Sequence, residues 1–293
     1  MVEGGGSMTA VQQTRSQLPA GVQSSRQGRA GVLIRTVLTT LANTAIMLTV
    51  ILLLWLGLLR VFDVSGFVGK GPLDVSEHLF AEEESAATRA EIWGLTLATL
   101  RDAAIGFVAG MIAAAVIAVG IVMSRIVESA VMPIAMIVRS VPLIALAPLI
   151  ILALGRGTAV VAAMGGTVVL FPALVTIVFG LRSVTPQIRD VVHVYGGSTW
   201  DVLRKVAVPS ALPAFFSAVR ISVPGAFTGA LLAEWLATGE GIGYAVVSAV
   251  SRSQNTQVWA LVVVITLVSV VLYMVAQLVE NLVLEHYDMA KDS

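Results

Sequence analysis

The sequence predicts an all-α integral membrane protein with about six transmembrane helices and a cytoplasmic helix–turn–helix loop between the fourth and fifth spans. Of its 293 residues, 57% are hydrophobic and only 12% are charged, whereas charged residues make up roughly a quarter of an ordinary soluble domain. The mean hydropathy is +0.91. The apolar residues form continuous runs, whereas the strands of a transmembrane β-barrel would alternate apolar and polar residues. These observations together favour spanning helices.

The same composition argues against several classes of protein. The 18 basic and 18 acidic residues balance, so no basic field points to a nucleic-acid partner. The absence of cysteine excludes a disulfide framework, a thiolate metal site and a cysteine nucleophile. His78, His193 and His286 lack the spacing of metal ligands, and no span holds a pair of carboxylates arranged as a catalytic couple. We therefore expect no enzymatic activity, no metal and no cofactor in this chain.

The chain is expected to divide into a tail, a membrane domain and a second tail. Residues 1–35 are polar and contain no apolar core of signal-peptide length. Residues 1–7 end in Gly-Gly-Gly-Ser before Met8 and are interpreted as the remnant of an expression tag, with a natural flexible tail as the alternative. Residues 36–285 are expected to form the transmembrane domain, and residues 286–293 a cytoplasmic tail.

Six stretches are long and apolar enough to span a membrane, which takes about 20 residues of helix. Only the third and the fifth contain ionisable residues, which are Arg139 in the third and Arg220 and Glu234 in the fifth. The six stretches are Leu38–Leu59, Ala103–Met123, Ala130–Leu154, Thr158–Phe179, Pro213–Ala237 and Val258–Val279.

The distribution of Lys and Arg predicts the orientation, because cytoplasmic loops carry an excess of both. With six spans, both termini lie on one side, which would hold ten basic residues against five on the other. Both termini are therefore expected in the cytoplasm. The acidic segment from Glu77 to Glu91 then lies outside, either as a solvated connection or as a short surface helix. The ten are Arg15, Arg26, Arg29, Arg35, Arg125, Arg182, Arg189, Arg204, Lys205 and Lys291, and the five are Arg60, Lys70, Arg89, Arg156 and Arg252.

The longest cytoplasmic connection, Leu181–Leu212, is expected to be ordered. Val184–Tyr195 can form one short helix, and Gly196-Gly197 then breaks it, since glycine readily turns the chain. Loops of this length usually have a function or are disordered, and this one carries the signals of two helices.

The second helix of this connection is predicted over Thr199–Val206. Ser198 and Asp201 have the spacing of a capping box, in which the serine side chain accepts a backbone N–H at the start of a helix. Pro209 and Pro213 are expected to end this helix and to begin the fifth span, where a missing N–H is tolerated.

This connection resembles the cytoplasmic loop of the permease subunits of binding-protein-dependent ABC importers. That pattern is Glu-Ala-Ala, three residues, Gly, nine residues, Ile, one residue and Leu-Pro. Here the corresponding residues are Asp190-Val191-Val192, Gly196, Val206 and Val208-Pro209, at the same spacings. The departures are Asp for Glu, Val-Val for Ala-Ala and Val for Leu, and the two larger valines would change the local packing against the partner.

The resemblance extends over residues 91–285. Within the family, this part of the chain is most similar to the nitrate/sulfonate/taurine branch. The order and spacing of several further matches carry this assignment. They are Arg101 and Gly106 in the second span, Arg139, Pro142 and Pro148 in the third, Ser210-Ala211-Leu212-Pro213 and Arg220 at the fifth, and Ala233-Glu234 with Gly239–Gly243 after it.

The resemblance implies a permease subunit of the cell inner membrane that couples to a cytoplasmic ABC ATPase dimer, with ATP and Mg on that partner. It also implies an extracytoplasmic solute-binding protein, a second permease copy in a homodimer, and surrounding membrane lipid. Arg204 and Lys205 would pair with acids of the ATPase, or merely reflect the excess of cytoplasmic positive charge. The residues expected to couple to the ATPase are Asp190, Val191, Val192, Gly196, Gly197, Ser198, Arg204, Lys205, Val206 and Pro209.

The charged residues within the spans are candidates for the translocation pathway, because an ionisable residue in a bilayer usually faces a bundle interior or water. Arg139, with Ser140 and Pro142, would suit an anionic substrate such as a sulfonate, taurine or nitrate-like solute. The alternative for Arg139 is a structural ion pair with Glu234 or Asp102. Arg220 and Glu234 are too far apart along one helix to touch, so each needs another partner.

Glycine spacings predict two further features. Gly106 and Gly110, like Gly225 and Gly229, form the G-x-x-x-G pattern that lets helices approach closely in lipid. Gly239–Gly243 predicts a turn at the outer end of the fifth span, either a docking place for a binding protein or a plain connection.

Two other functions compete with the ABC permease. An ion-coupled secondary transporter would show an inverted repeat with broken helices, and the spans lack that symmetry. A membrane-embedded enzyme would need a catalytic constellation. The substrate, and the choice between a homodimer and a heterodimer, are left open by the sequence.

Overall fold

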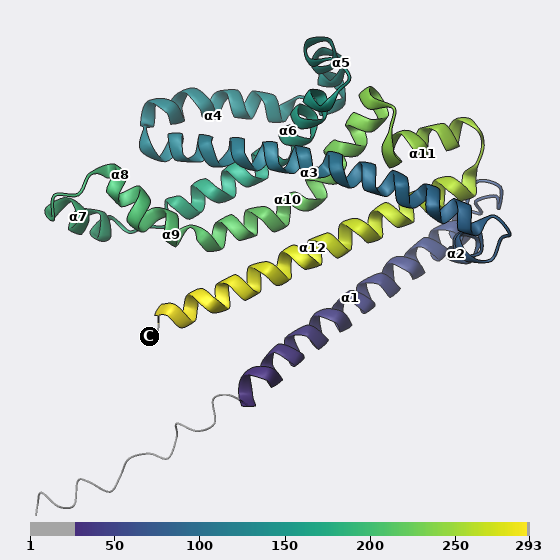
Figure 1. Cartoon of the computed structure of the whole chain (residues 1–293), viewed down its shortest axis with the longest axis horizontal. Coiled ribbons are helices and arrows are strands. Elements are labelled where there is room, and N and C mark those ends of the chain that lie inside the picture. Colours follow the sequence, from purple (N-terminus) through teal and green to yellow (C-terminus); the bar gives the residue numbers. More distant parts are fainter. Residues whose placement is uncertain (1–26, 292–293) are drawn as a thin grey trace, which may run out of the picture. The chain divides into compact units, whose positions relative to one another are not determined.

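The computed structural model describes residues 27–291, and its side chains are described from Thr44 to Glu285 and at a few earlier positions. The described chain is entirely helical, as the sequence predicts, and it forms two units, Met1–Val64 and Ser65–Ser293. The first unit contributes one helix, α1 (Gln27–Val61) (Figure 1). This helix starts inside the stretch expected to be a polar tail, while the proposed tag remnant lies outside the described residues.

The second unit contains the remaining helices (Figure 1). Short elements separate long ones, and two of the segments, η1 and η2, are π-helical. The elements are α2 (Pro72–Phe80), α3 (Ser85–Met123), α4 (Arg125–Ser140), α5 (Leu143–Leu154), α6 (Thr158–Leu181), α7 (Pro186–Val194), α8 (Thr199–Val202), η1 (Leu203–Ala207), α9 (Val208–Ser210), α10 (Leu212–Ala233), η2 (Glu234–Thr238), α11 (Gly241–Ser251) and α12 (Asn255–Lys291).

Within residues 27–291, five helices are long and apolar enough to cross a membrane, and the count reaches six if the bent pair α4–α5 is one span. The expected third span, Ala130–Leu154, is therefore not a single helix but is divided between α4 and α5. Its two halves meet at 108°, where Val141 adopts an extended backbone and Pro142 precedes α5. Proline disfavours helical geometry in the residue before it and supplies no N–H of its own, so the helix ends there.

The second span is part of a longer helix than expected. α3 begins at Ser85, directly after a turn that holds Glu82, Glu83 and Glu84. The acidic segment is thus divided among the end of α2, this turn and the first turns of α3.

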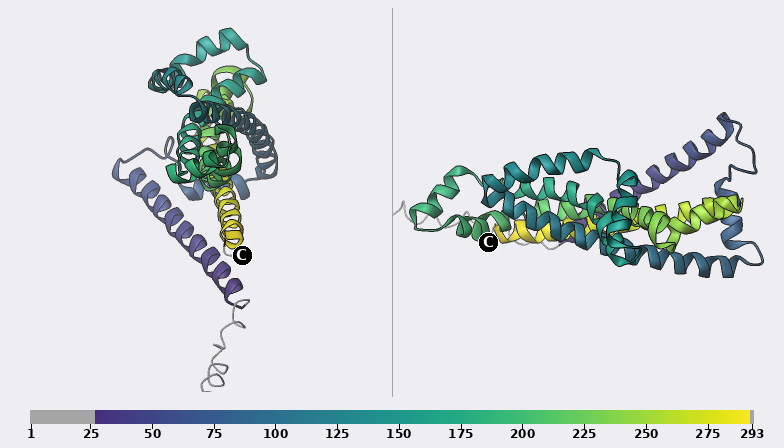
Figure 2. Two further views of the ribbon diagram at one scale, coloured as in Figure 1. Left: turned by 90° about the vertical axis from the view of Figure 1, so that its left-hand side faces the viewer. Right: turned by 90° about the horizontal axis from the view of Figure 1, so that it is seen from above.

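Helices α3, α6 and α10 pack tightly around a crossing made of glycine (Figure 2). A Cβ atom on Gly106 would lie 2.7 Å from Cα of Gly165, and one on Gly229 would lie 2.5 Å from the same atom. The three backbones therefore meet without side chains between them, which confirms the close packing predicted for Gly106 and Gly229. Gly225 is less crowded, since a Cβ there would lie 3.3 Å from Cγ1 of Val168.

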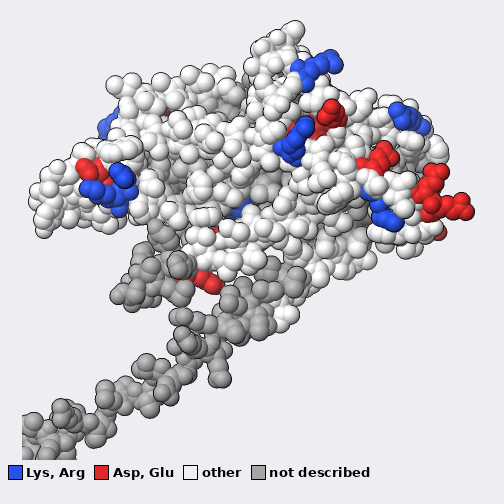
Figure 3. Space-filling model, in the orientation of Figure 1, with Lys and Arg blue, Asp and Glu red and all other residues white. Residues whose placement is uncertain are grey.

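The outward faces of the spans are apolar. Leu152, Phe179 and Ile112 are 84%, 77% and 60% exposed, as expected for residues that face lipid. On the face shown in Figure 3, most charged side chains of the second unit gather toward its two ends. One end carries α7 and α8, and the other carries α2 and the start of α3 (Figure 1).

Candidate functional site

The turn between α7 and α8 needs two glycines for two different reasons. Gly196 has a φ of +81°, a left-handed conformation that costs other residues about 1–2 kcal/mol. Gly197 is crowded instead, because a Cβ there would lie 2.5 Å from Cγ1 of Val192. The amide of Gly197 donates to the Val192 carbonyl at 2.9 Å, and Nδ1 of His193 lies 2.9 Å from the Gly197 carbonyl oxygen. The predicted helix break is confirmed, and it is tightly closed.

A complete capping box begins α8, as the sequence predicts. The backbone N–H of Asp201 donates to Oγ of Ser198 at 3.2 Å, and the N–H of Ser198 donates to Oδ2 of Asp201 at 2.9 Å. Lys205 then pairs with the other oxygen of Asp201 at 2.8 Å. Hydrogen bonding to Lys205, and then to Ser198, holds the pKa of Asp201 well below its usual range.

The helix that starts at α8 runs further than the sequence suggests. The N–H of Val208 donates to the carbonyl of Leu203, five residues earlier, and the chain stays helical through α9. The expectation that Pro209 ends the helix is therefore wrong. Proline has no N–H to give to a carbonyl, and the wider π-helical turn of η1 precedes it. Only Ala211 separates α9 from α10, and Pro213 sits in the first turn of α10 as expected.

One face of this segment is seated on the ends of two spans. Val202, Leu203 and Ala207 are buried, and they line a small cavity of about 130 Å³ together with residues from the ends of α3 and α6, which are Val122, Met123 and Leu181. The junction with α10 is equally close, since a Cβ on Gly180 of α6 would lie 3.3 Å from Cβ of Ala211. The segment is thus fixed to α3, α6 and α10 together.

The opposite face is exposed and apolar, and we call it the apolar tip, defined by Val191, Val194, Tyr195 and Trp200. Val194 and Tyr195 are 83% and 88% exposed, and Val191 and Trp200 are each 55% exposed. These residues lie outside the helices that are long and apolar enough to span a membrane. Exposed apolar patches of this kind mark protein–protein contact sites, which are enriched in aromatic residues.

The structure gathers the residues that the sequence singled out for coupling into this one segment. Most are exposed, and four are partly buried beneath them. The exposed ones are Asp190, Val191, Gly196, Ser198, Arg204 and Lys205, and the partly buried ones are Val192, Gly197, Val206 and Pro209.

The residues singled out for the pathway fall in two places. Arg139, Ser140 and Pro142 are exposed at the break between α4 and α5. Glu234 is fully buried at the end of α10. The structure pairs Asp102, the other suggested partner of Arg139, with its neighbour Arg101 at 3.2 Å.

Glu234 organises the turn that leads into α11. Its Oε2 accepts the backbone N–H of Gly243 at 2.7 Å, and a Cβ atom on Gly241 would collide with its carboxylate. Next to this bond, the N–H of Ile242 donates to Oγ1 of Thr99 on α3 at 2.9 Å. Glu234 therefore holds a buried turn together, with α3 as a second support.

The sequence reasoning did not find the partner of Arg220. The structure places Glu280 of α12 beside it, with Nε of Arg220 2.7 Å from Oε2 of Glu280. Ser217 donates to the other oxygen of this carboxylate at 2.5 Å, and Nη1 of Arg220 donates to the hydroxyl of Tyr273 at 3.2 Å. The inference that Arg220 and Glu234 need separate partners is confirmed. An acidic residue near the end of the last apolar run was the available signal.

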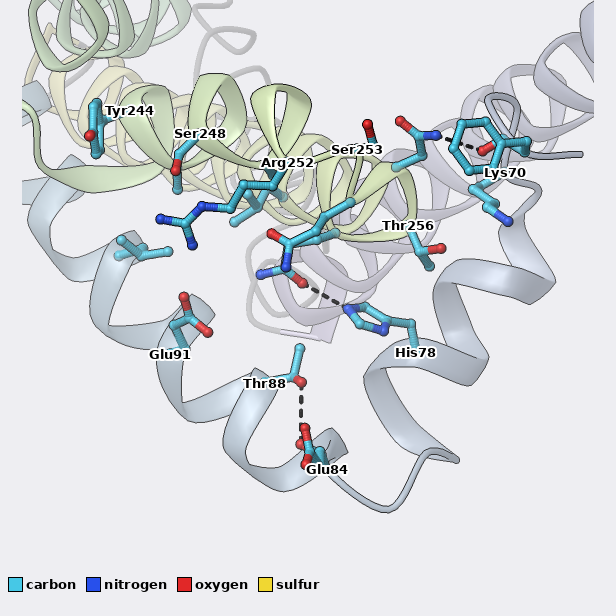
Figure 4. Close-up of a pocket in the computed structure, with 18 residues that line it drawn as sticks. Lys70, His78, Glu84, Thr88, Glu91, Tyr244, Ser248, Arg252, Ser253 and Thr256 are labelled. Atoms are coloured by element: carbon cyan, nitrogen blue, oxygen red, sulfur yellow. Dashed lines mark hydrogen bonds between the residues drawn. The ribbon is translucent and has the colours of Figure 1, made fainter.

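A polar pocket of about 690 Å³ lies at the other end of the unit, among α2, the start of α3 and the α11–α12 turn. His78 bridges Oε2 of Glu82 at 2.8 Å and Oε1 of Gln257 at 2.7 Å. Figure 4 shows Arg252 and Glu91 pointing into the pocket from opposite walls. The end opposite the apolar tip is therefore hollow, polar and of mixed charge.

An all-helical membrane unit with a rigid segment protruding at one end and a polar pocket at the other has the features of a membrane transport component. The chain belongs to the family of binding-protein-dependent transport system inner membrane components, whose profile matches residues 106–285.

Three relatives are similar to this chain over most of its length. A "Probable ABC transporter permease protein" of Haemophilus influenzae is 30% identical, over 76% of this chain and 89% of its own length. The riboflavin transport system permease protein RibX of Chloroflexus aurantiacus is 29% identical, over 65% and 71%. The nitrate import permease protein NrtB of Leptolyngbya laminosa is 24% identical, over 60% and 63%.

Proposed function

We propose that this chain is the transmembrane permease subunit of an ATP-driven importer, and that its apolar tip docks on a cytoplasmic ATPase. The observation that carries the proposal is the exposure of Val194 and Tyr195 on a segment outside the spans. Exposed apolar surface of this kind marks a site of contact with another molecule. ATP and Mg would be bound by that partner, and this chain would supply no catalytic residue.

The proposed stroke follows from how the segment is held. A displacement of α8 would move α10, because η1 and α9 connect them with a single non-helical residue. It would also move α6, since Gly180 lies against Ala211 and the crossing at Gly165 and Gly229 leaves no flexible side chain between α6 and α10. Packed helices transmit such rigid-body displacements.

The pathway would carry a small solute delivered by an extracytoplasmic binding protein to the end that holds the polar pocket. Arg139, exposed at the α4–α5 break, supports an anionic substrate such as a sulfonate, taurine or nitrate-like solute, because a guanidinium binds oxyanions through charge-assisted hydrogen bonds. A second, identical copy of the chain would complete the pathway. One relative is named as a nitrate import permease.

The decisive experiment removes one aromatic side chain from the apolar tip. Tyr195→Ala should weaken binding of the partner ATPase by about tenfold or more, because truncation of a central interface aromatic commonly costs about 2 kcal/mol. Phe179→Ala is the matched control, since Phe179 is 77% exposed on a span. Affinity of the ATPase for the purified permease and substrate-stimulated ATP hydrolysis are the measurements. Equal binding by the two variants would contradict the proposed docking surface.

The proposed orientation has its own test, because the chain has no cysteine. A single cysteine at Ser210 should react with a membrane-impermeant maleimide only in inverted vesicles, and one at Glu83 only in intact cells. The reverse pattern would overturn the cytoplasmic assignment of the apolar tip.

An ion-coupled secondary transporter is the competing function. Uptake that continues at the normal rate in cells without the ATPase, and stops when the ion gradient is collapsed, would favour it and refute the ATP-driven importer.

A further inference from the structure

A second cavity at the end that carries α7 and α8 is lined by three arginines. It has a volume of about 530 Å³ and lies where α3 ends, α4 begins, α6 ends and α7 passes. Its lining residues are Ile121, Val122, Arg125, Glu128, Arg182 and Arg189.

The charges around this cavity do not balance. Arg182 pairs with Glu128 at 2.8 Å, which neutralises one arginine. Arg125 and Arg189 take part in no ion pair within the side chains that the structure describes. With three arginines and one carboxylate among its lining residues, the cavity carries an excess of two positive charges. Each guanidinium can offer two parallel N–H donors to a phosphate or carboxylate.

The position of Arg125 is not explained by helix stability. It is the first residue of α4, and a cation at the N-terminus of a helix opposes the helix dipole, whereas an anion there is favoured. An excess of cytoplasmic arginine would explain how many arginines lie at this end. It would not explain why three of them, from the start of α4, the residue after α6 and the middle of α7, converge on one cavity.

The cavity lies at the ends of two apolar helices long enough to span a membrane, where lipid headgroups are expected. Arg125 follows the apolar end of α3 at Met123 by two residues, and Arg182 directly follows the apolar end of α6 at Leu181. Its inner wall is formed by Ile121, which is buried, and Val122. Basic pockets between transmembrane helices with an apolar inner side are a known arrangement for binding anionic headgroups.

We propose that this cavity binds the phosphate of an anionic phospholipid headgroup. Arg125 and Arg189 donate to the phosphate oxygens, and the lipid bridges the start of α4 to α7. Because α7 itself carries Val191 and Val194 of the apolar tip, the bound lipid fixes the position of the tip relative to the spans. The site requires no ATPase, so it stands or falls independently of the proposed transport function.

The test is a titration of the purified full-length chain in neutral detergent with phosphatidylglycerol, phosphatidylcholine or inorganic phosphate. Bound lipid is counted by native mass spectrometry. Phosphatidylglycerol should bind saturably, and phosphatidylcholine should bind at least about tenfold more weakly, since it lacks net negative charge. The double variant Arg125→Gln/Arg189→Gln should weaken phosphatidylglycerol binding by about tenfold or more, as expected for the loss of charge-assisted hydrogen bonds. Arg182 is left unchanged because it holds Glu128.

Two control variants make the result specific. Arg204→Gln removes an exposed cation from the same end outside the cavity, and Arg156→Gln removes one from the connection between α5 and α6. Both variants should bind phosphatidylglycerol with the affinity of the unsubstituted chain. If Arg204→Gln weakened phosphatidylglycerol binding as much as the double variant does, the lipid would be attracted to the positive surface in general, and the proposal would be overturned. If inorganic phosphate bound saturably with the same affinity as phosphatidylglycerol, the ligand of the cavity would be a free anion and not a lipid, and the proposal would be overturned. Weaker ATPase binding with unchanged lipid binding in the double variant would assign the cavity to the protein interface.

Discussion

Before and after α10, a carboxylate accepts a backbone N–H beside a π-helical segment, but one carboxylate is partly exposed and the other is buried. At one end, Asp201 accepts a backbone N–H and closes the start of α8, which leads through the π-helical segment η1 toward α10. At the other, Glu234 begins the π-helical segment η2 and accepts the N–H of Gly243. Asp201 is bound to neighbours four residues away or fewer, and Lys205, its ion-pair partner, is 70% exposed. Glu234 is fully buried.

The difference in exposure between Asp201 and Glu234 decides how strongly each carboxylate stabilises its turn. The side chain of Asp201 is 33% exposed, so water can replace part of what its bonds supply. The bond of Glu234 lies inside the packed unit, beside the bond from Ile242 to Thr99 on α3, and water cannot reach it. Loss of a buried hydrogen-bond partner costs more than loss of an exposed one.

The largest expected contrast is between two glycines that share a left-handed conformation. Gly241 has a φ of +77° and Gly196 a φ of +81°, but a Cβ on Gly241 would collide with the carboxylate of Glu234, whereas Gly196 has nothing within 4 Å. Gly196→Ala should cost about 1–2 kcal/mol of stability from backbone strain alone. Gly241→Ala should cost roughly 2–5 kcal/mol, because overpacking adds to the same strain. Thermal unfolding in detergent measures both. Equal losses would show that the crowding around Glu234 relaxes freely.

A smaller contrast is expected for the two carboxylates. Glu234→Ala should destabilise the chain by about 1–3 kcal/mol, since it leaves the buried N–H of Gly243 without an acceptor. Glu234→Gln keeps an acceptor and most of the volume, so it should recover much of this loss. Asp201→Ala should have a clearly smaller effect than Glu234→Ala, because Asp201 is partly exposed to water whereas Glu234 is fully buried.

The same pair of variants separates a structural role of Glu234 from a role in the pathway. If Glu234→Gln unfolds like the unsubstituted chain but abolishes substrate uptake, the carboxylate acts on the substrate. If uptake follows stability across both variants, Glu234 only supports the α10–α11 turn.

The smallest expected effect is a pH dependence confined to α8. The pKa of Asp201 is lowered in the folded chain, so its stabilising effect is fully present above the unfolded value of about 3.9. That effect is lost as the pH falls through the lower, folded-state pKa. The segment should therefore be unchanged between neutral pH and about pH 5, and should loosen only in stronger acid. Fluorine NMR of 5-fluorotryptophan at Trp200 measures this, and Asp201→Asn should abolish the acid transition. Loosening near pH 6 would contradict the assignment.

Sequence reasoning succeeded where the relevant interactions are local. The S-x-x-D capping box, the break at Gly196-Gly197 and the apolar runs were all predictable, because each depends on residues within a few positions of one another. It also predicted that Arg220 and Glu234 could not form an ion pair with each other, since their separation along one helix follows from helix geometry alone.

Sequence reasoning failed where distant segments or a competition between backbone geometries decide the outcome. The partnership of Arg220 with Glu280 joins residues on two helices, and nothing local to either residue specifies it. The sharp bend between α4 and α5 and the continuation of the helix past Pro209 depend on how prolines are accommodated by the packing around them.

The amino-acid sequence by itself determined that this chain crosses a membrane several times and carries a structured segment between two of the spans, because hydrophobicity and capping act over short stretches of chain. Only the tertiary structure decided which glycines meet at the crossing of α3, α6 and α10, which carboxylate is buried, and which side of the α7–α8 segment remains uncovered. Those outcomes depend on close packing between helices distant in sequence, where the removal of a single Cβ atom or the burial of a single charge selects one arrangement over its competitors.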